Sequence, residues 1–401
     1  MNKYLSALAL AATSVSAAAA QPIALLAPGA RDQVPSALAP APKSLATSGL
    51  DRAPVMVSHA LDPSASLAAA PTPYVAHSRE FWSDVGESEL RRGVKLVTTA
   101  PGALIRLSPQ GGAGAALDPA GVLVRVHGRT LDANGASTAV ADTKALRSAG
   151  MAVPAGTLAF RLAAATGSGE VEIAAPHAQG RYLVHVFEPD SAIAMDFGAD
   201  RDTVLGGGTI AFRAEAEGSA HLALASGLVT APDGYSADLA FTANPDGSFS
   251  ARFTPDAAHS RGPALWEAHV FTAVGGAQQV LRDATTAFAV TAPTARFGGS
   301  AELARDGAGL HVDLAVDASA ASRYEASGVL YGTGADGALH PAALAQSATW
   351  LGGPGKLELA FGADTFAGGL HAPFELRDLR LVDQATMSVI ERRERALVIG
   401  D

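Results

Sequence analysis

Residues 239–253 read LAFTANPDGSFSARF, and this stretch has a clear β-strand pattern on both sides of a turn. Apolar side chains recur at every second position, at Leu239 and Phe241 and again at Phe249, Ala251 and Phe253. Such an alternation indicates a half-buried β-strand, and the Asn-Pro-Asp-Gly sequence between the two runs is typical of a turn. The stretch therefore predicts two short strands joined by a turn.

The same pattern continues on both sides of this stretch, through residues 193–293. Alternating runs begin at Ile210 and Leu222, and a longer run extends over Leu265–Val274. About seven short strands separated by turns, over about a hundred residues, match an immunoglobulin-like β-sandwich. Because the chain contains no cysteine, this domain would lack the inter-sheet disulfide.

Two neighbouring segments carry similar alternation and predict two more β-rich domains. Residues 79–192 include the strand pattern of 182–187, and residues 294–401 include that of 310–316. We therefore expect a mainly β chain of consecutive β-sandwich domains.

Short helices are expected only in the first of these segments. The Glu87–Arg92 helix should end at Gly93, because glycine readily adopts the left-handed conformation that closes a helix. Asp142–Ala149 also has helical character, and Ser78 is a candidate N-cap for a short helix that contains Phe81.

The N-terminal region predicts an export signal followed by a leader. Lys3 is the only charge before an apolar run that ends in the alanines 17–20, as in a secretory signal peptide, so we expect cleavage after Ala20 and a secreted or periplasmic protein. No later stretch is apolar enough for a membrane span, so the mature chain should have no transmembrane segment. Residues 21–78 are rich in Ala, Pro and Ser with little periodicity, which predicts a disordered, low-complexity leader. The alternative is a propeptide or a strap laid over a later domain.

Composition and missing motifs disfavour several functions. The formal net charge of −10 argues against a nucleic-acid binder, which needs a basic surface. The absence of cysteine removes thiol catalysis and cysteine-based metal sites. No His-Glu-x-x-His, Gly-x-Ser-x-Gly or Walker sequence occurs. We name no catalytic residue and no cofactor-binding residue.

Two sets of residues are candidates for binding. Asp196, Asp200 and Asp202 cluster at the predicted boundary between the first two domains, where oxygen-rich loops favour calcium, although the spacing is not that of a calcium loop. Trp350, followed by a glycine-rich stretch, is the tryptophan expected to reach a surface and contact a ligand.

Two weaker pairs have a simpler structural explanation. His311 and Asp313 share one face of a strand, but two ligands do not make a metal site. Glu267 and His269 resemble an acid–base pair, yet they lie on a mid-domain strand where packing roles are more common than catalysis.

Several stretches also suggest a family. Residues 89–94 (ELRRGV), 103–109 (ALIRLSP), 182–186 (YLVHV) and 374–381 (FELRDLRL) resemble a group of secreted bacterial proteins. The group is known as a domain of unknown function with a C-terminal immunoglobulin-like domain. The resemblance implies export and consecutive β-sandwiches, and it supplies no catalytic residue.

Three functions follow as hypotheses. The first is a non-enzymatic exported protein that binds a protein or glycan at the cell surface or in the envelope, which requires an exposed apolar patch or a free sheet edge. The second is a secreted hydrolase, or its accessory module, which requires a pocket holding at least two perturbed titratable groups. The third is an adhesin stiffened by calcium, which requires the three aspartates to converge.

Overall fold

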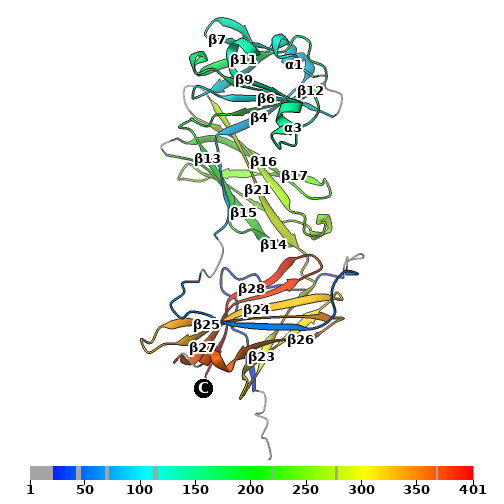
Figure 1. Cartoon of the computed structure of the whole chain (residues 1–401), viewed down its shortest axis with the longest axis vertical. Coiled ribbons are helices and arrows are strands. Elements are labelled where there is room, and N and C mark those ends of the chain that lie inside the picture. The colour runs from blue at the N-terminus through cyan, green and yellow to red at the C-terminus, as the bar shows by residue number, and fades with distance from the viewer. Residues whose placement is uncertain are drawn as a thin grey trace, which may run out of the picture. The chain divides into compact units, whose positions relative to one another are not determined.

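The structure is a computed structural model that describes residues 21–41, 47–67, 72–111, 116–218, 220–275, 279–366 and 369–400. The expected signal peptide, residues 1–20, lies outside the described residues. The chain divides into a terminal unit, formed by the chain up to residue 71 together with 291–401, and a central unit, residues 72–290. The strands of the described residues form six antiparallel sheets, which confirms the mainly β prediction (Figure 1).

The central unit begins with a β-sandwich that we call the first sandwich. Its core is formed by apolar side chains that alternate along the strands, among them Phe81, Ile105, Phe160 and Tyr182. One sheet has the order β4-β12-β6-β10-β9, with bounds Glu80–Val85, Arg181–Phe187, Leu104–Gln110, Leu158–Leu162 and Ser137–Asp142. The other has the order β5-β11-β7-β8, with bounds Val94–Thr98, Gly169–Ala174, Leu123–Val126 and Arg129–Asp132.

The helices of the first sandwich test the sequence prediction directly. The predicted helix α1 is confirmed at Glu87–Arg92 and ends at Gly93, whose φ of 118° suits glycine. Helix α3, Thr143–Ser148, is confirmed as well, with the Asp142 carboxylate accepting from the first turn. The remaining helical turns are α2 Ala133–Ala136, η1 Pro119–Gly121 and η2 Ala164–Thr166.

The helix predicted near Phe81 is wrong. This residue lies on β4, which pairs with β12 along its whole length. The side chain of Phe81 is buried in the core, and its neighbour Trp82 faces the other side of the sheet. Pairing with a strand a hundred residues away overrides the local capping signal.

A second sandwich completes the central unit. Its core surrounds Trp266 and contains Phe197, Phe212 and Phe288. One sheet has the order β18-β19-β15-β13-β3, with bounds Phe241–Ala243, Phe249–Phe253, Ile210–Ala216, Met195–Ala199 and Val75–Ser78. The other has the order β14-β21-β20-β16-β17, with bounds Thr203–Leu205, Val280–Thr291, Trp266–Val274, Leu222–Thr230 and Ser236–Leu239; η3 is Ala257–His259.

The turn predicted at Asn244–Gly247 is confirmed. Strands β18 and β19 pair with Phe241 opposite Ala251 and Ala243 opposite Phe249. The turn is closed by the bond from the Asn244 amide to the Ser248 carbonyl, 2.8 Å, and Gly247 adopts a φ of 83°.

The terminal unit is a third sandwich. Its core includes Leu314, Tyr324, Leu359 and Leu381. One sheet has the order β1-β22-β23-β26, with bounds Gln21–Ala24, Ala295–Asp306, Gly309–Ala318 and Gly355–Gly362. The other has the order β2-β25-β24-β27-β28, with bounds Val55–Ala60, Leu339–Leu351, Ser322–Thr333, His371–Asp383 and Ser388–Ile399; η4 is Ala363–Phe366.

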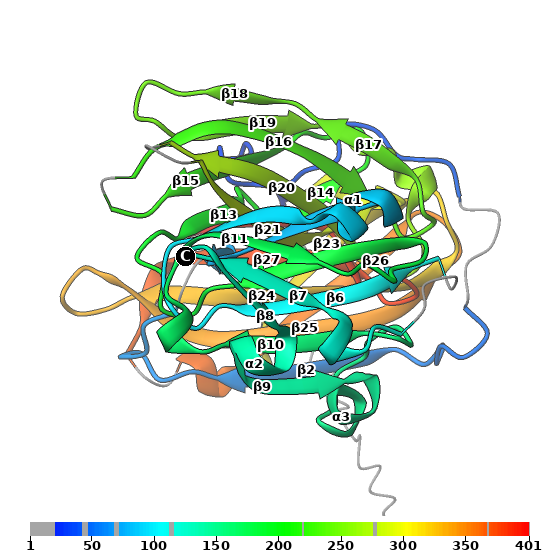
Figure 2. The same ribbon diagram turned by 90° about the horizontal axis from the view of Figure 1, so that it is seen from above.

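The leader differs from the predicted disorder. Strand β1 pairs with β22, strand β2 pairs with β25, and strand β3 pairs with β13. Figures 1 and 2 show the blue strand β2 lying along the yellow-orange strand β25 at the rim of the sheet. The prediction failed because backbone pairing at a sheet edge needs no apolar periodicity, and an Ala- and Pro-rich segment can supply the amides and carbonyls. The strap that the sequence left as the alternative describes this segment better.

None of the helices described in the structure is long and apolar enough to cross a membrane.

Candidate functional site

The two sandwiches of the central unit meet at a buried ion pair. Glu188 directly follows β12, and its carboxylate accepts from Arg282 of β21 at 2.8 Å, with both side chains 0% exposed. The amides of Thr99 and Ala100 also donate to this carboxylate. The guanidinium donates further to the Ser191 hydroxyl and the Ile193 carbonyl. A buried pair with this many partners fixes the junction between the two sandwiches.

Two perturbed titratable groups line the same junction. Burial raises the pKa of the Asp283 carboxyl to about 7, although the carboxylate accepts from the Trp82 amide at 2.7 Å. Burial lowers the pKa of His269 to about 4, and its ring meets the Trp82 ring edge-on at 5.3 Å. These groups are packed between strands, so the perturbation follows from structural burial. For His269 this is the packing role that its position on a mid-domain strand favoured.

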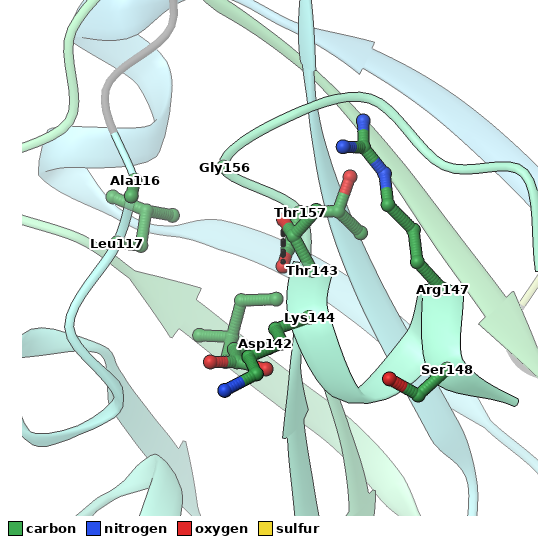
Figure 3. Close-up of a pocket in the computed structure, with 10 residues that line it drawn as sticks. Ala116, Leu117, Asp142, Thr143, Lys144, Arg147, Ser148, Gly156 and Thr157 are labelled. Carbon is green, nitrogen blue, oxygen red and sulfur yellow. Dashed lines mark hydrogen bonds between the residues drawn. The ribbon is translucent and has the colours of Figure 1, made fainter.

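The first sandwich has a hollow beside α3 that is about 630 Å³ in volume (Figure 3). Its polar lining is used by the fold: Asp142 caps α3, Arg147 donates to the Val153 carbonyl, and Thr143 donates to the Thr157 carbonyl. These hydrogen bonds give the polar groups a role in holding α3 and the segment that follows it in place.

An unusual sheet edge lies in the terminal unit, and we call it the β2 edge, residues 55–60. All six residues of this strand are exposed, and Val55, Met56 and Val57 are 49%, 49% and 41% accessible. Strand β2 is the last strand of its sheet, and in the described part of the chain it pairs only with β25. The backbone groups on its outer side are thus available for another strand.

The opposite edge of the same sheet is built differently. Strand β28 carries five consecutive charged residues, 391–395, and a leader bridge joins Gln33 to Arg392. Charged and covered edges prevent strand addition in natural proteins. Residues 55–60 contain no Asp, Glu, Lys or Arg, so the β2 edge lacks this protection.

Trp350, the predicted ligand-binding tryptophan, lies on β25 next to the start of the β2 edge. The guanidinium carbon of Arg52 sits 4.4 Å from the centre of its ring, a cation–π contact. Arg323, opposite Trp350 on β24, donates to the carbonyls of Asp51 and Ala53 at 2.7 and 2.6 Å. Together these contacts hold the chain immediately before β2.

The predicted calcium residues do not converge. Asp196 lies on β13, the Asp200 carboxylate pairs with Arg201 and the Ala211 amide, and Asp202 is exposed. Among the described residues, the three carboxylates do not form a group with ligand atoms within 4.8 Å of one another. Such a group instead joins Asp196 to His77 and Glu217.

Sequence reasoning missed the β2 edge and the partners of Asp196. The Val-Met-Val run at 55–57 was a β-propensity signal inside a segment whose composition suggested disorder. His77 is 119 residues from Asp196, and only the pairing of β3 with β13 places the two opposite each other.

The comparisons with known proteins agree with this architecture. Residues 46–188 match the N-terminal domain, and residues 294–400 the C-terminal domain, of a domain of unknown function, DUF4785. No curated protein matches the chain.

The crystal structure of a DUF4785 family protein from Legionella pneumophila is similar to this chain. The two are 18% identical with a TM-score of 0.70, and the match covers 91% of this chain and 98% of that one. A tetra-tandem repeat from the extending region of a large adhesion protein is 14% identical, covers 88% of this chain and 82% of that one, and has a TM-score of only 0.19. The two matched segments and the shared fold together place this chain in the DUF4785 family.

Proposed function

We propose that this chain is an exported, non-enzymatic binding protein, secreted or periplasmic, that binds an extended segment of a partner protein at the β2 edge. The immunoglobulin-like character of residues 193–293 belongs to the same proposal. The observation that carries it is an uncharged strand at the end of a sheet, with an exposed residue at every position. An extended peptide can add to such an edge through main-chain hydrogen bonds, with side chains on both faces giving specificity.

The fold itself provides an example of this mode of binding. The leader strand β2 joins β25 through residues almost three hundred positions apart in the chain, with Val55 opposite Ala348 and Ala60 opposite Ala343. A partner strand would repeat the same pairing on the outer side of β2. Because residues 55–60 carry no charge, the matching partner strand is uncharged and rich in β-branched or other apolar side chains.

Protein is favoured over glycan as the partner. Sugar rings need free aromatic faces, and Trp350, which lies on β25 beside the start of the β2 edge, is covered by Arg52. Val55, Met56 and Val57 instead offer aliphatic surface, which suits the side chains of a strand.

The experiment compares capture of envelope proteins by three chains. Val57→Lys places a charge on the β2 edge, as natural edge strands do. Leu224→Lys is the control, because Leu224 is 58% exposed but lies outside the β2 edge, on β16, where it pairs with Ala273 of β20. We expect Val57→Lys to reduce the captured partner at least tenfold and Leu224→Lys to leave it unchanged, with equal melting temperatures. Equal capture by Val57→Lys and the unaltered chain would contradict the proposal.

A further inference from the structure

Three side chains from separate segments meet on the outer face of the second sandwich. His77 lies on β3, Asp196 lies opposite it on β13, and Glu217 directly follows β15. One ligand atom of each lies within 4.8 Å of the other two. His77 is exposed and the two carboxylates are partly exposed, so an ion from solution can reach them.

Both carboxylates approach the same nitrogen. The Nδ1 atom of His77 is 2.5 Å from Asp196 Oδ1 and 3.5 Å from Glu217 Oε1. A ring nitrogen offers one in-plane proton or one lone pair, so it cannot donate well to two carboxylates at once. Ligand atoms around a zinc ion lie about 3.4 Å apart, which follows from bonds of about 2.1 Å in tetrahedral geometry. The observed separations need only small side-chain rotations to reach this spacing.

A similar cluster in the terminal unit, formed by His311, Asp306 and Glu358, does not direct both carboxylates at one ring nitrogen. His311 contacts Glu358 through Nδ1 at 2.6 Å, but contacts Asp306 through Nε2 at 3.5 Å. Each carboxylate therefore has its own ring nitrogen, on opposite sides of the imidazole. No single ion could take all three as ligands without a large rearrangement.

We propose that His77, Asp196 and Glu217 bind a divalent transition-metal ion of the zinc class, with the exposed side completed by water. One imidazole and two carboxylates are ligands that Zn²⁺ accepts, whereas Ca²⁺ uses oxygen ligands only. The ion therefore differs from the calcium expected from Asp196, Asp200 and Asp202. Arg79 supports the arrangement, because it contacts Glu217 through the other oxygen, Oε2, at 3.4 Å and leaves Oε1 directed at His77.

The location gives the ion a structural role. Strand β3 is the edge strand of its sheet, and the chain passes from it through Arg79 into β4 of the first sandwich. An ion held by His77, Asp196 and Glu217 would fasten this crossing strand to β13 and to the end of β15. Because the ion binds the folded chain, it raises the melting temperature as its concentration rises.

The test uses the full chain without a polyhistidine tag, freed of metal with a chelator and titrated calorimetrically at pH 7 with ZnCl₂ and separately with CaCl₂. We expect one zinc per chain, a melting temperature that rises with zinc concentration, and no comparable effect of calcium. His77→Ala and Glu217→Gln should each weaken zinc binding at least tenfold and abolish the thermal shift. His311→Ala is the matched control and should bind zinc like the unaltered chain.

The exposed side chains allow these variants to fold, and equal melting temperatures without metal will establish that they do. No zinc binding by the unaltered chain, or equal binding by His77→Ala, would overturn the proposal. Loss of binding in His311→Ala, or calcium binding as tight as zinc, would overturn it as well. The site lies outside the β2 edge, so these outcomes are independent of partner binding.

Discussion

Glu188 and Arg282 lie 2.8 Å apart, carboxylate oxygen to guanidinium nitrogen, and neither side chain reaches solvent. The first residue belongs to the first sandwich and the second to the second sandwich. This pair and its hydrogen-bonded neighbours lie at the junction of the two sandwiches within the compact unit of residues 72–290. Removing one partner leaves a buried charge without compensation, which is far more destabilising than the loss of a surface pair.

We therefore expect Arg282→Met to lower the free energy of unfolding of the central unit by about 3 kcal/mol or more. Lys95→Ala is the control, because Lys95 pairs with Glu170 at 3.0 Å with both side chains more than half exposed, and should change it by less than about 0.5 kcal/mol. Urea unfolding followed by tryptophan fluorescence in a Trp350→Phe background measures both. Similar small effects from the two substitutions would show that the junction does not depend on the ion pair.

Asp283 should make stability fall as the pH rises. Burial raises the pKa of its carboxyl from the ordinary 3.8 to about 7, so the folded chain retains a proton that the unfolded chain loses. The resulting stabilisation is complete below pH 3.8 and is lost as the pH rises through 7. We expect Asp283→Asn to remove this decline, which amounts to at most about 1.4 kcal/mol for each pH unit. Unfolding free energies of the two chains that stay parallel from pH 5 to 8 would contradict this.

His269 should make the stability of the folded chain fall as the pH falls. Burial lowers its pKa from 6.5 to about 4, so the unfolded chain gains a proton first when the pH falls. The stabilisation from the neutral ring is present above pH 6.5 and is lost as the pH falls through 4. We expect His269→Gln to flatten the loss of stability between pH 6.5 and 4 relative to the unaltered chain. Melting temperatures measured across this pH range check the direction of the effect. A steeper loss of stability in His269→Gln than in the unaltered chain would contradict the prediction.

Arg323 should control how firmly the leader is held. Arg323 is buried, and its guanidinium donates to two carbonyls of the leader, those of Asp51 and Ala53. We expect Arg323→Met to speed amide hydrogen exchange in residues 55–60 at least tenfold while β24 and β27 stay protected. Arg380→Met is the control, because Arg380 pairs with Asp378 within its own sheet. Unchanged exchange in β2 would mean that strand pairing alone holds the leader.

The sequence was most informative where strands are close neighbours in the chain. The hairpin around Asn244–Gly247 and the helix ending at Gly93 depend on local alternation and turn chemistry, and both were predicted. Phe81 was predicted to lie in a short helix, but it lies on β4. The local sequence could not show this, because β4 pairs with the distant strand β12.

The binding surfaces were harder to predict for the same reason. The β2 edge owes its place to pairing with β25, nearly three hundred residues away. Asp196 was recognised as a possible ligand, but His77 and Glu217 reach it only through strand pairing. Spacing along the sequence suggested Asp200 and Asp202 as its partners instead. Both residues follow the end of β13, and the Asp200 carboxylate accepts from the Ala211 amide.

Site-specific photo-crosslinking in intact cells of the native host tests most directly whether the β2 edge binds a partner strand. A photoreactive amino acid replaces Val57 in one chain and Leu224 in another, since both side chains are exposed, Val57 lies on the β2 edge and Leu224 lies on β16 of the central unit. We expect a discrete adduct with one partner protein from position 57 and none from position 224. The absence of an adduct at position 57, or the same adducts from both positions, would contradict the account.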